Sequence, residues 1–204
     1  MSVRTDRRPV RTLAEEDVLR ARFYGLLANV LANPPSASML ATLRQIEGDD
    51  TSLGRALRAL AQAARSVAVE AVADEFEALF IGLTEGELRP YASYYLTGFL
   101  YEKPLADLRH DMARLGVKRA LGIHEPEDHI ASLCEIMQGL ILGTFGEAAY
   151  LDEQKTFFDF RLRPWAAHFF ADLRQARAAE FYRPVGQVGG IFMEIEREAF
   201  AIAV

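Results

Sequence analysis

Apolar residues recur at spacings of three and four along nearly the whole chain, the period of amphipathic helices. The most apolar stretch runs from 130 to 145 and carries one stripe of Ile130, Leu133, Cys134, Met137, Leu140 and Ile141. Comparable stripes contain Leu19, Phe23, Leu26 and Val30; Leu53, Leu57, Leu60, Ala64 and Val67; Leu105, Leu108, Met112 and Leu115; and Val188, Phe192, Ile195 and Ala199. No stretch alternates as a strand would. The pattern predicts an all-α, single-domain bundle of roughly eight to ten helices.

Capping residues and helix breakers divide this pattern into elements. Residues 1–11 are predicted to be a flexible tail, which leaves one helical domain over 12–204. Thr12 and Glu15 form a capping-box pattern for the first helix, and Ser36, Thr51 and Asp152 are predicted to cap later ones. The sequence allows a bend over 67–71 without fixing it, and it predicts a loop over 84–93 and a break at 182–184 before the last helix.

The motif Glu125-Pro126-Glu127-Asp128-His129 precedes the most apolar stretch. Proline suits a first helical turn, and carboxylates there complement the helix dipole. At about 100° per residue, Asp128 is predicted to point away from the buried stripe, with His129 on its flank. Two interpretations stay open: simple capping of a core helix, or a carboxylate and an imidazole placed to meet a ligand.

Composition narrows the classes of partner and compartment. The net charge of −6 disfavours nucleic acid and suits a basic peptide. The single cysteine, Cys134, lies on an apolar stripe, so no disulfide within the chain is expected. No apolar run approaches the ~20 residues of a membrane span. The basic start of the chain is not followed by an apolar stretch, so a cytoplasmic protein without a signal peptide is expected.

Motifs for catalysis and cofactors are not evident. His124, Glu125, Glu127, Asp128 and His129 lack the spacing of known helical metal sites, and His110 and His168 are predicted to be surface or edge residues. Residues 186–190 are rich in glycine but lack the strand and lysine of a phosphate-binding loop. No cofactor is therefore expected, and a binding protein is favoured over an enzyme.

Two motifs occur together in this chain. Leu79-Phe80 is followed after about ten residues by Pro90-Tyr91-Ala92-Ser93-Tyr94-Tyr95, and later by the Glu125–His129 motif with Leu133 and Met137. Taken together, these motifs resemble the TorD/DmsD/NarJ family of molybdoenzyme-specific chaperones, nearest its TorD-like branch. Pro164-Trp165 and Phe181-Tyr182 add weaker similarity. The resemblance runs from roughly Val18 to Phe200. Phe160-Arg161-Leu162 departs from it, since relatives often carry His-Leu before the tryptophan.

The resemblance implies a cytoplasmic chaperone and not an enzyme. Such a protein binds the twin-arginine signal region and the apo-form of a molybdopterin oxidoreductase, of the dimethyl sulfoxide or trimethylamine N-oxide reductase or formate dehydrogenase kind. It assists cofactor insertion and delays export. Some relatives act on clients without such signals, and some bind guanine nucleotides. Others form domain-swapped dimers, so whether this protein forms a homodimer is left open.

The residues that carry the resemblance form the expected client-binding site. Glu127 and Asp128 are candidates to pair with guanidinium groups. Asp128 and His129 would form its polar end, and the tyrosine-rich loop its apolar wall. The full predicted set is Leu79, Phe80, Pro90, Tyr91, Ser93, Tyr95, Glu125, Pro126, Glu127, Asp128 and His129. The alternatives are a helical hydrolase that uses Asp128 and His129, and a helical scaffold that binds a partner helix.

Overall fold

The computed structural model describes residues 13–83, 85–119 and 125–202. Within them the chain forms helices connected by loops and turns, and the predicted all-α, single-domain fold is confirmed. The elements are α1 (Glu15–Ala32), α2 (Ala37–Leu43), α3 (Ser52–Ser66), α4 (Val69–Phe76), the π-helical turn η1 (Glu77–Ile81), α5 (Ala92–Thr97), α6 (Lys103–Arg114), α7 (Ile130–Leu142), α8 (Leu151–Phe157), the π-helical turn η2 (Phe158–Leu162), α9 (Ala166–Gln175) and α10 (Tyr182–Ile202).

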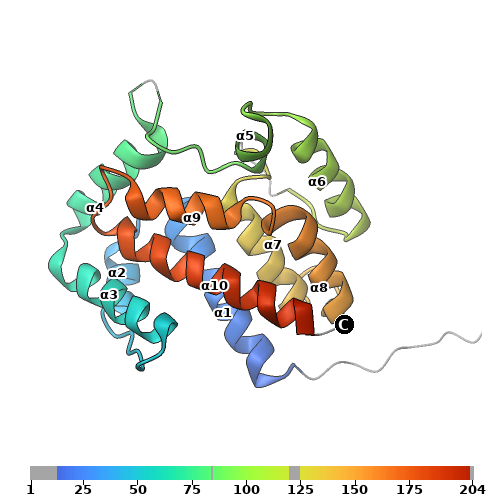
Figure 1. Cartoon of the computed structure of the whole chain (residues 1–204), viewed down its shortest axis with the longest axis horizontal. Helices are drawn as coiled ribbons and strands as arrows, with labels where there is room; N and C mark the ends of the chain where they lie inside the picture. The colour runs from blue at the N-terminus through green and yellow to red at the C-terminus, as the bar shows by residue number, and fades with distance from the viewer. Residues whose placement is uncertain (1–12, 84, 120–124, 203–204) are drawn as a thin grey trace, which may run out of the picture.

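Two helix pairs organise the core. α1 packs most extensively against α7, and α9 against α10. Figure 1 shows α10 crossing in front of α1, with α3 and α4 at one end of the molecule and α5 and α6 at the other. Close approach of α9 and α10 depends on Gly189, since a Cβ there would lie 2.2 Å from a ring carbon of Phe170. The absence of a side chain at Gly189 thus lets the Phe170 ring of α9 pack directly against the backbone of α10.

Several predicted boundaries are confirmed by hydrogen bonds. The Ser36 hydroxyl accepts from the Met39 amide at 3.2 Å, and the Thr51 hydroxyl accepts from the Gly54 amide at 3.0 Å. The chain bends between α3 and α4, within the range where the sequence left a bend open. These caps satisfy amides that the first helical turn leaves without partners.

Other boundaries differ from the prediction. α1 begins after Ala14 without a side-chain cap, and Thr12 lies outside the described residues. α8 begins after Tyr150, whose amide donates to the Glu153 carboxylate at 2.9 Å, so Asp152 lies inside the helix and is not its cap. The predicted break at 182–184 is wrong, because α10 starts at Tyr182.

A distant carboxylate explains the early start of α10. Glu75 on α4 accepts from the amides of Glu180, Phe181 and Tyr182 at 2.8, 3.0 and 2.8 Å. These groups would otherwise be unpaired at the helix N-terminus, where a negative charge is also favoured by the dipole. A capping group about a hundred residues away leaves no local pattern in the sequence, so the prediction missed it.

The buried faces of α1 and α10 are also rotated from the predicted stripes. Leu19 is 54% exposed and Ile195 is 42% exposed, and Ala199 is exposed too. Tyr24 and Glu196 are buried in their place. The Glu196 carboxylate accepts from Arg20 Nε at 2.7 Å, from Arg20 Nη2 at 2.9 Å and from the Tyr24 hydroxyl at 2.9 Å. Because a buried charge must be paired, this polar network accounts for the burial of Tyr24 and Glu196 in the interface.

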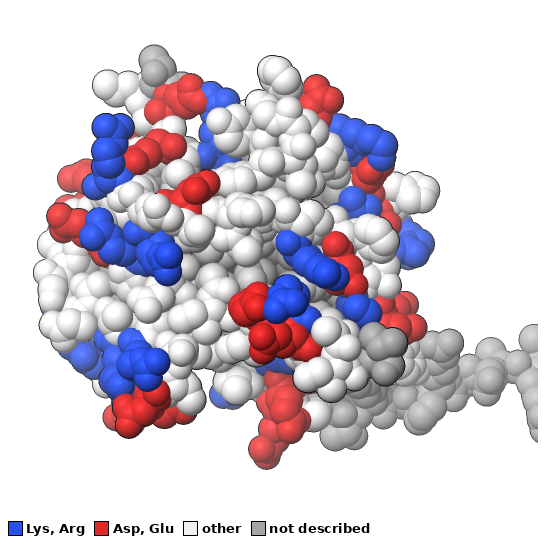
Figure 2. Space-filling view, viewed as in Figure 1, with Lys and Arg blue, Asp and Glu red and all other residues white. Residues whose placement is uncertain are grey.

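The surface in Figure 2 carries charges of both signs. Lysine and arginine lie close to aspartate and glutamate around a largely uncharged central strip. No broad basic field covers this face. Among the described helices, none is both long enough and apolar enough to cross a membrane.

Candidate functional site

An isolated antiparallel bridge joins the two motifs that stood out in the sequence. It pairs Tyr91 with His129. The Ala92 amide donates to the Asp128 carbonyl at 3.0 Å, and the Ile130 amide donates to the Pro90 carbonyl at 2.8 Å. We call the paired segments 90–93 and 125–130 the clasp. The structure thus brings the tyrosine-rich loop and the acidic motif together, as the predicted site requires.

The acidic motif is a turn and not the first turn of α7, so that part of the prediction is wrong. α7 begins at Ile130, and His129 is its N-cap with extended backbone (φ −62°, ψ 140°). The imidazole Nδ1 accepts from the Ala131 amide at 3.1 Å. Since the bridge holds His129 extended, the helix cannot start earlier. Pro126, Glu127 and Asp128 therefore precede the helix.

The expected outward orientation of Asp128 is also wrong. Its side chain is buried, with 1% of the residue exposed. Oδ2 accepts from the Ser93 amide at 2.8 Å and from the Ser93 hydroxyl at 2.6 Å. Asp128 and His129 line separate pockets, so their side chains point to different sides of the clasp. Asp128 therefore links the two segments.

A groove of about 710 Å³ lies along the His129 side of the clasp. It lies between the end of α1, the α4–η1 segment and the first half of α7. The described residues that line it are Ala28, Asn29, Ala32, Asn33, Pro34, Phe76, Phe80, Ile81, Pro90, Tyr91, Glu125, His129, Ala131, Ser132, Glu135 and Gln138. It therefore gathers Phe80, Pro90, Tyr91, Glu125 and His129 from the predicted set. Its volume suits several side chains of a ligand.

The groove is negatively charged. Glu125 and Glu135 are the charged members of its described lining, which holds no lysine or arginine. Burial lowers the pKa of His129 to about 4, so the imidazole is neutral at pH 7. The two carboxylates therefore set the charge of the groove.

Aromatic contacts hold one carboxylate in place. The Tyr91 hydroxyl donates to Glu125 Oε1, and the Tyr91 and His129 rings meet edge to face with centroids 5.2 Å apart. Burial, and then the contact with Glu125, raises the pKa of Tyr91, so the phenol remains a donor. Arg119 Nη2 donates to the Glu125 carbonyl at 2.8 Å. The Glu125 carboxylate is thus preorganised at the groove.

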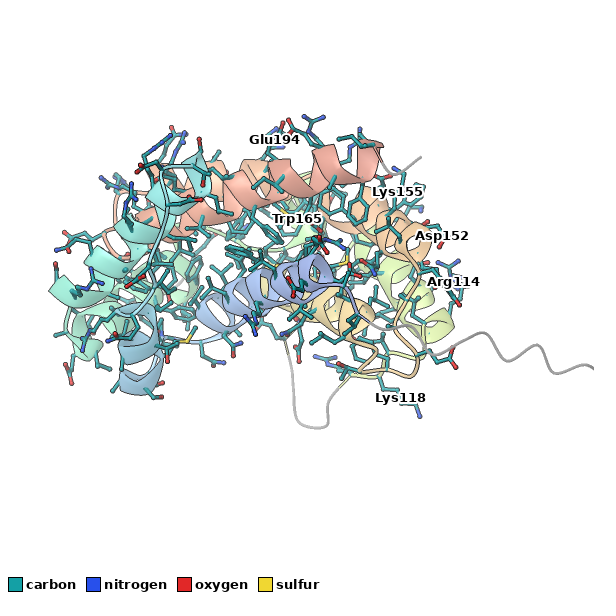
Figure 3. All side chains as sticks on the ribbon, turned by 90° about the horizontal axis from the view of Figure 1, so that it is seen from below. Arg114, Lys118, Asp152, Lys155, Trp165 and Glu194 are labelled. Atoms are coloured by element: carbon teal, nitrogen blue, oxygen red, sulfur yellow. The ribbon has the colours of Figure 1, made fainter. Side chains whose placement is uncertain are left out.

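The remaining predicted residues lie outside the groove. Leu79 is buried in the core and Pro126 is buried in the clasp. Tyr95 donates to Asp172 at 2.8 Å and lies 5.3 Å from the Trp165 ring, which Figure 3 shows inside the molecule. Glu127 pairs with Arg109 at 2.8 Å. Burial would raise the pKa of Glu127, but the hydrogen bond from Arg109, a backbone hydrogen bond and the charges of Arg109 and Arg119 together outweigh burial and lower the pKa.

Sequence reasoning missed the wall contributed by α7 and α1. Ser132, Glu135 and Gln138 line the groove at intervals of three, which places them on one helical face. This polar row beside the apolar stripe was visible in the sequence and could have been used. Asn29 and Asn33 near the end of α1 lacked such a signal, because only tertiary packing brings α1 beside α7.

The geometry gives no support to a hydrolase. Asp128 bonds Ser93 and does not orient the His129 ring, whose Nδ1 accepts a backbone amide. His110 and His168 are exposed, as predicted. In the part of the chain that the structure describes, no three histidine, cysteine, aspartate or glutamate residues cluster as metal ligands would. His124, named in the sequence, lies outside the described residues. Cys134 is buried, and burial raises its thiol pKa.

Known proteins are similar to this chain over most of its length. The TorD chaperone of Vibrio parahaemolyticus is 26% identical over 198 residues, which cover 87% of this chain and 92% of that protein. The TorD chaperone of Aliivibrio fischeri is 32% identical over 98 residues, which cover 44% of this chain and 46% of that protein.

Solved structures and family profiles agree with these matches. A crystal structure from Archaeoglobus fulgidus, described as a redox enzyme maturation protein, superposes with a TM-score of 0.60 at 20% identity. It covers 92% of this chain and 99% of that chain, and so supports the fold. The profile of a family described as nitrate reductase delta subunit matches residues 46–171, more than half of the chain. The chain therefore belongs to the nitrate reductase delta subunit family, which includes the TorD and NarJ proteins.

Proposed function

We propose that this protein is a cytoplasmic chaperone for the maturation of a molybdopterin oxidoreductase and that it binds the client's signal region in the groove. It holds the apo-enzyme for cofactor insertion and delays export until the client is mature. Family membership and the similarity to TorD chaperones support the general role. The observation that carries the binding site is an acidic groove beside the clasp, lined by apolar and aromatic side chains.

The groove matches the chemistry of a twin-arginine signal. Such a segment carries two guanidinium groups followed by apolar residues. Glu125 and Glu135 supply carboxylates, with which guanidinium forms paired, charge-assisted hydrogen bonds. Phe76, Phe80 and Ile81 supply an apolar wall. The groove thus offers carboxylates to the two arginines of the signal and an apolar wall to the residues that follow them.

Polar side chains of the groove would fix the backbone of the ligand. Asn29, Asn33, Ser132 and Gln138 carry amide and hydroxyl groups along its lining. These groups can donate and accept, so they suit the peptide groups of an extended or helical segment. A micromolar dissociation constant corresponds to a net binding free energy of about 8 kcal/mol. This is the part of the contact energy that remains after the costs of ordering and association. Such affinity allows release of the client after maturation.

Peptide binding tests the proposal directly. A fluorescent synthetic peptide with two adjacent arginines and a following apolar segment is titrated onto the full chain. We expect the double variant Glu125→Gln, Glu135→Gln to bind at least about tenfold more weakly, since a charged hydrogen bond contributes about 1.5–3 kcal/mol. A peptide with both arginines replaced by lysine should also bind more weakly, because lysine lacks the forked geometry.

Matched controls separate groove binding from general charge. Glu147→Gln removes one exposed carboxylate outside the groove and should leave the affinity unchanged. Circular dichroism of each variant establishes that it is folded. Equal affinity of the folded double variant and the wild type would remove the groove from the proposal. Failure of the wild type to capture an apo-oxidoreductase from cells that make one would count against the chaperone role itself.

A further inference from the structure

The start of the chain carries its own pair of adjacent arginines. Residues 1–12 precede the described part of the chain, and their charged side chains are Arg4, Asp6, Arg7, Arg8 and Arg11. This segment is therefore basic, although the whole chain has a net charge of −6. A basic segment is attracted to an acidic groove on the same molecule.

Helices α1 and α7 connect this segment to the groove. Figure 1 shows the first turns of α1 at the edge of the molecule. A Cβ at Gly25 would lie 2.4 Å from the side-chain nitrogen of Gln138, and later residues of α1 line the groove together with earlier residues of α7. The two helices are therefore antiparallel. Gln138 marks the end of the groove that is nearer to the start of α1.

An exposed face of α7 continues from the groove towards the start of α1. Glu135, Gln138 and Leu142 follow at spacings of three and four, so they share one helical face. Glu135 and Gln138 line the groove, and Leu142 beyond them is 41% exposed. Antiparallel packing sets Glu135 beside Ala28, since each lies three residues from the Gly25–Gln138 contact. This face therefore offers a carboxylate and, closer to the start of α1, an apolar side chain.

The residues before α1 are long enough to reach Glu135. Along α1, the rise from Glu15 to Ala28 is about 20 Å. The seven residues from Arg8 to Glu15 span up to about 24 Å when extended, and the arginine side chain adds further reach. The adjacent arginines can therefore contact Glu135 of the same chain.

We propose that segment 1–12 lies back along α1 and that Arg7 and Arg8 occupy the Glu135 end of the groove until a client displaces them. The inference rests on the function proposed for the groove and adds a regulation of that site. The guanidinium groups donate to the Glu135 carboxylate, and Val10 passes Leu142. A segment that offers only arginines then meets an occupied carboxylate.

A client signal can displace the segment because the segment lacks an apolar run. After Arg8 it offers Pro9 and Val10 and then another arginine. It therefore covers little of the aromatic wall formed by Phe76 and Phe80. A ligand that pairs with the carboxylate and also covers this wall gains apolar burial that the segment does not have. The competitor within the chain thus favours complete signals over short basic segments.

Tethering makes even a weak ligand effective. A short linker gives an effective concentration of about 1 mM. If the segment alone bound with a dissociation constant of about 0.2 mM, it would raise the apparent dissociation constant of a client about sixfold. The expected effect on peptide binding is therefore several-fold.

Titration of the twin-arginine peptide onto variants of the full chain measures this competition. The double variant Arg7→Gln, Arg8→Gln should bind the peptide at least about threefold more tightly than the wild type. Arg4→Gln with Arg11→Gln is the matched control, because it removes the same charge and keeps the adjacent pair, and it should have little effect. In a Glu135→Gln background, the double variant should also have little effect, since the partner of the two arginines is absent.

A spin label reports the position of the segment without any added peptide. A nitroxide is attached at Thr5→Cys, while the buried Cys134 stays unlabelled. We expect it to broaden the amide signals of Glu135 and Gln138, and we expect these signals to recover in the double variant. Spin-labelled protein mixed with isotope-labelled protein that has no spin label should show no broadening, since the contact lies within one chain.

The outcomes separate this inference from the function of the groove. Equal peptide affinity of the wild type and the Arg7→Gln, Arg8→Gln variant would overturn the inference, and so would broadening that persists in that variant or appears in the mixed sample. If the wild type bound no twin-arginine peptide, the function proposed for the groove would fail. Loss of broadening in the double variant would still support contact between the segment and Glu135.

Discussion

Two buried carboxylates, Glu196 and Asp128, differ in their hydrogen-bond partners. Glu196 is 0% exposed and accepts three hydrogen bonds, two of them from Arg20 and one from Tyr24. Asp128 is 1% exposed and accepts two hydrogen bonds from Ser93 through a single oxygen. Glu196 faces a cation within the chain, and Asp128 faces neutral donors. The first arrangement is complete and the second is not.

The difference indicates different roles. The Glu196 network joins α10 to α1, and a complete network rigidifies a core. The Asp128 arrangement joins the two segments of the clasp but leaves the buried Oδ1 atom without a hydrogen bond from any described residue. Incomplete satisfaction in an otherwise well-packed molecule is typical of binding sites. The comparison therefore predicts that changes at Glu196 act on stability, and changes near the clasp act on binding as well.

The largest effect is expected for Glu196→Gln. The substitution leaves the partly buried Arg20 without its main counter-ion, although Asp17 still pairs with Arg20 at 2.9 Å. Breaking a buried ion pair on one side destabilises a protein by about 3–5 kcal/mol. Urea denaturation should place this variant near the lower end of that range, because Asp17 remains. Peptide binding by the folded fraction should not change.

Glu194→Gln is the matched control for that substitution. Glu194 lies two residues earlier on α10, on the outer face of the helix, as Figure 3 shows, and its carboxylate pairs with Arg197 at 2.8 Å. Its exposed ion pair should contribute little to stability, because water and salt screen it. Equal destabilisation by the two variants would mean that the buried network contributes no more to stability than an exposed ion pair.

The next effect concerns pH and His129. Its folded pKa of about 4 lies below the ordinary 6.5, so between these values the unfolded state binds more protons. Stability contributed by neutral His129 is therefore fully present above pH 6.5 and is lost as the pH falls towards 4. At pH 5 the loss is on the order of 2 kcal/mol. Urea denaturation at pH 7 and pH 5 measures it.

His129→Asn provides the comparison, because asparagine also caps a helix well and does not titrate. The variant should lose about 2 kcal/mol less than the wild type between pH 7 and pH 5. Identical losses would show that another group carries the pH dependence and that His129 is not the buried, neutral cap described here.

A smaller effect is expected for Ser93→Ala. The variant removes the hydroxyl that donates to Asp128 at 2.6 Å but keeps the amide that donates at 2.8 Å. Loss of one hydrogen bond to a charged acceptor should destabilise by about 1–2 kcal/mol. A double-mutant cycle with Asp128→Asn measures the coupling. No coupling would mean that Asp128 is held by the backbone alone.

How much the sequence could predict differs between these regions. Helical periods and local caps such as Ser36 and Thr51 were predictable, because their causes lie within a few residues. The pairing of the two clasp motifs came from family resemblance, not from periodicity. Their burial did not follow from either, because the helical wheel assumed a helix where Asp128 lies in a turn. The Glu75 and Glu196 contacts join distant segments, so no local pattern encodes them.

The smallest effect on stability is expected for Glu135→Gln, and this sharpens the comparison most. Glu135 is exposed on α7, and no described group forms an ion pair with it, so the substitution should change the free energy of unfolding by less than about 0.5 kcal/mol. Binding of the twin-arginine peptide should nevertheless weaken, because a carboxylate of the groove is lost. Denaturation and peptide titration on the same preparation separate the two effects. If Glu135→Gln lowered stability and left peptide affinity unchanged, the distinction between a stabilising core network at Glu196 and a binding surface beside the clasp would be wrong. That distinction requires Glu135 to contribute to ligand binding and little to stability.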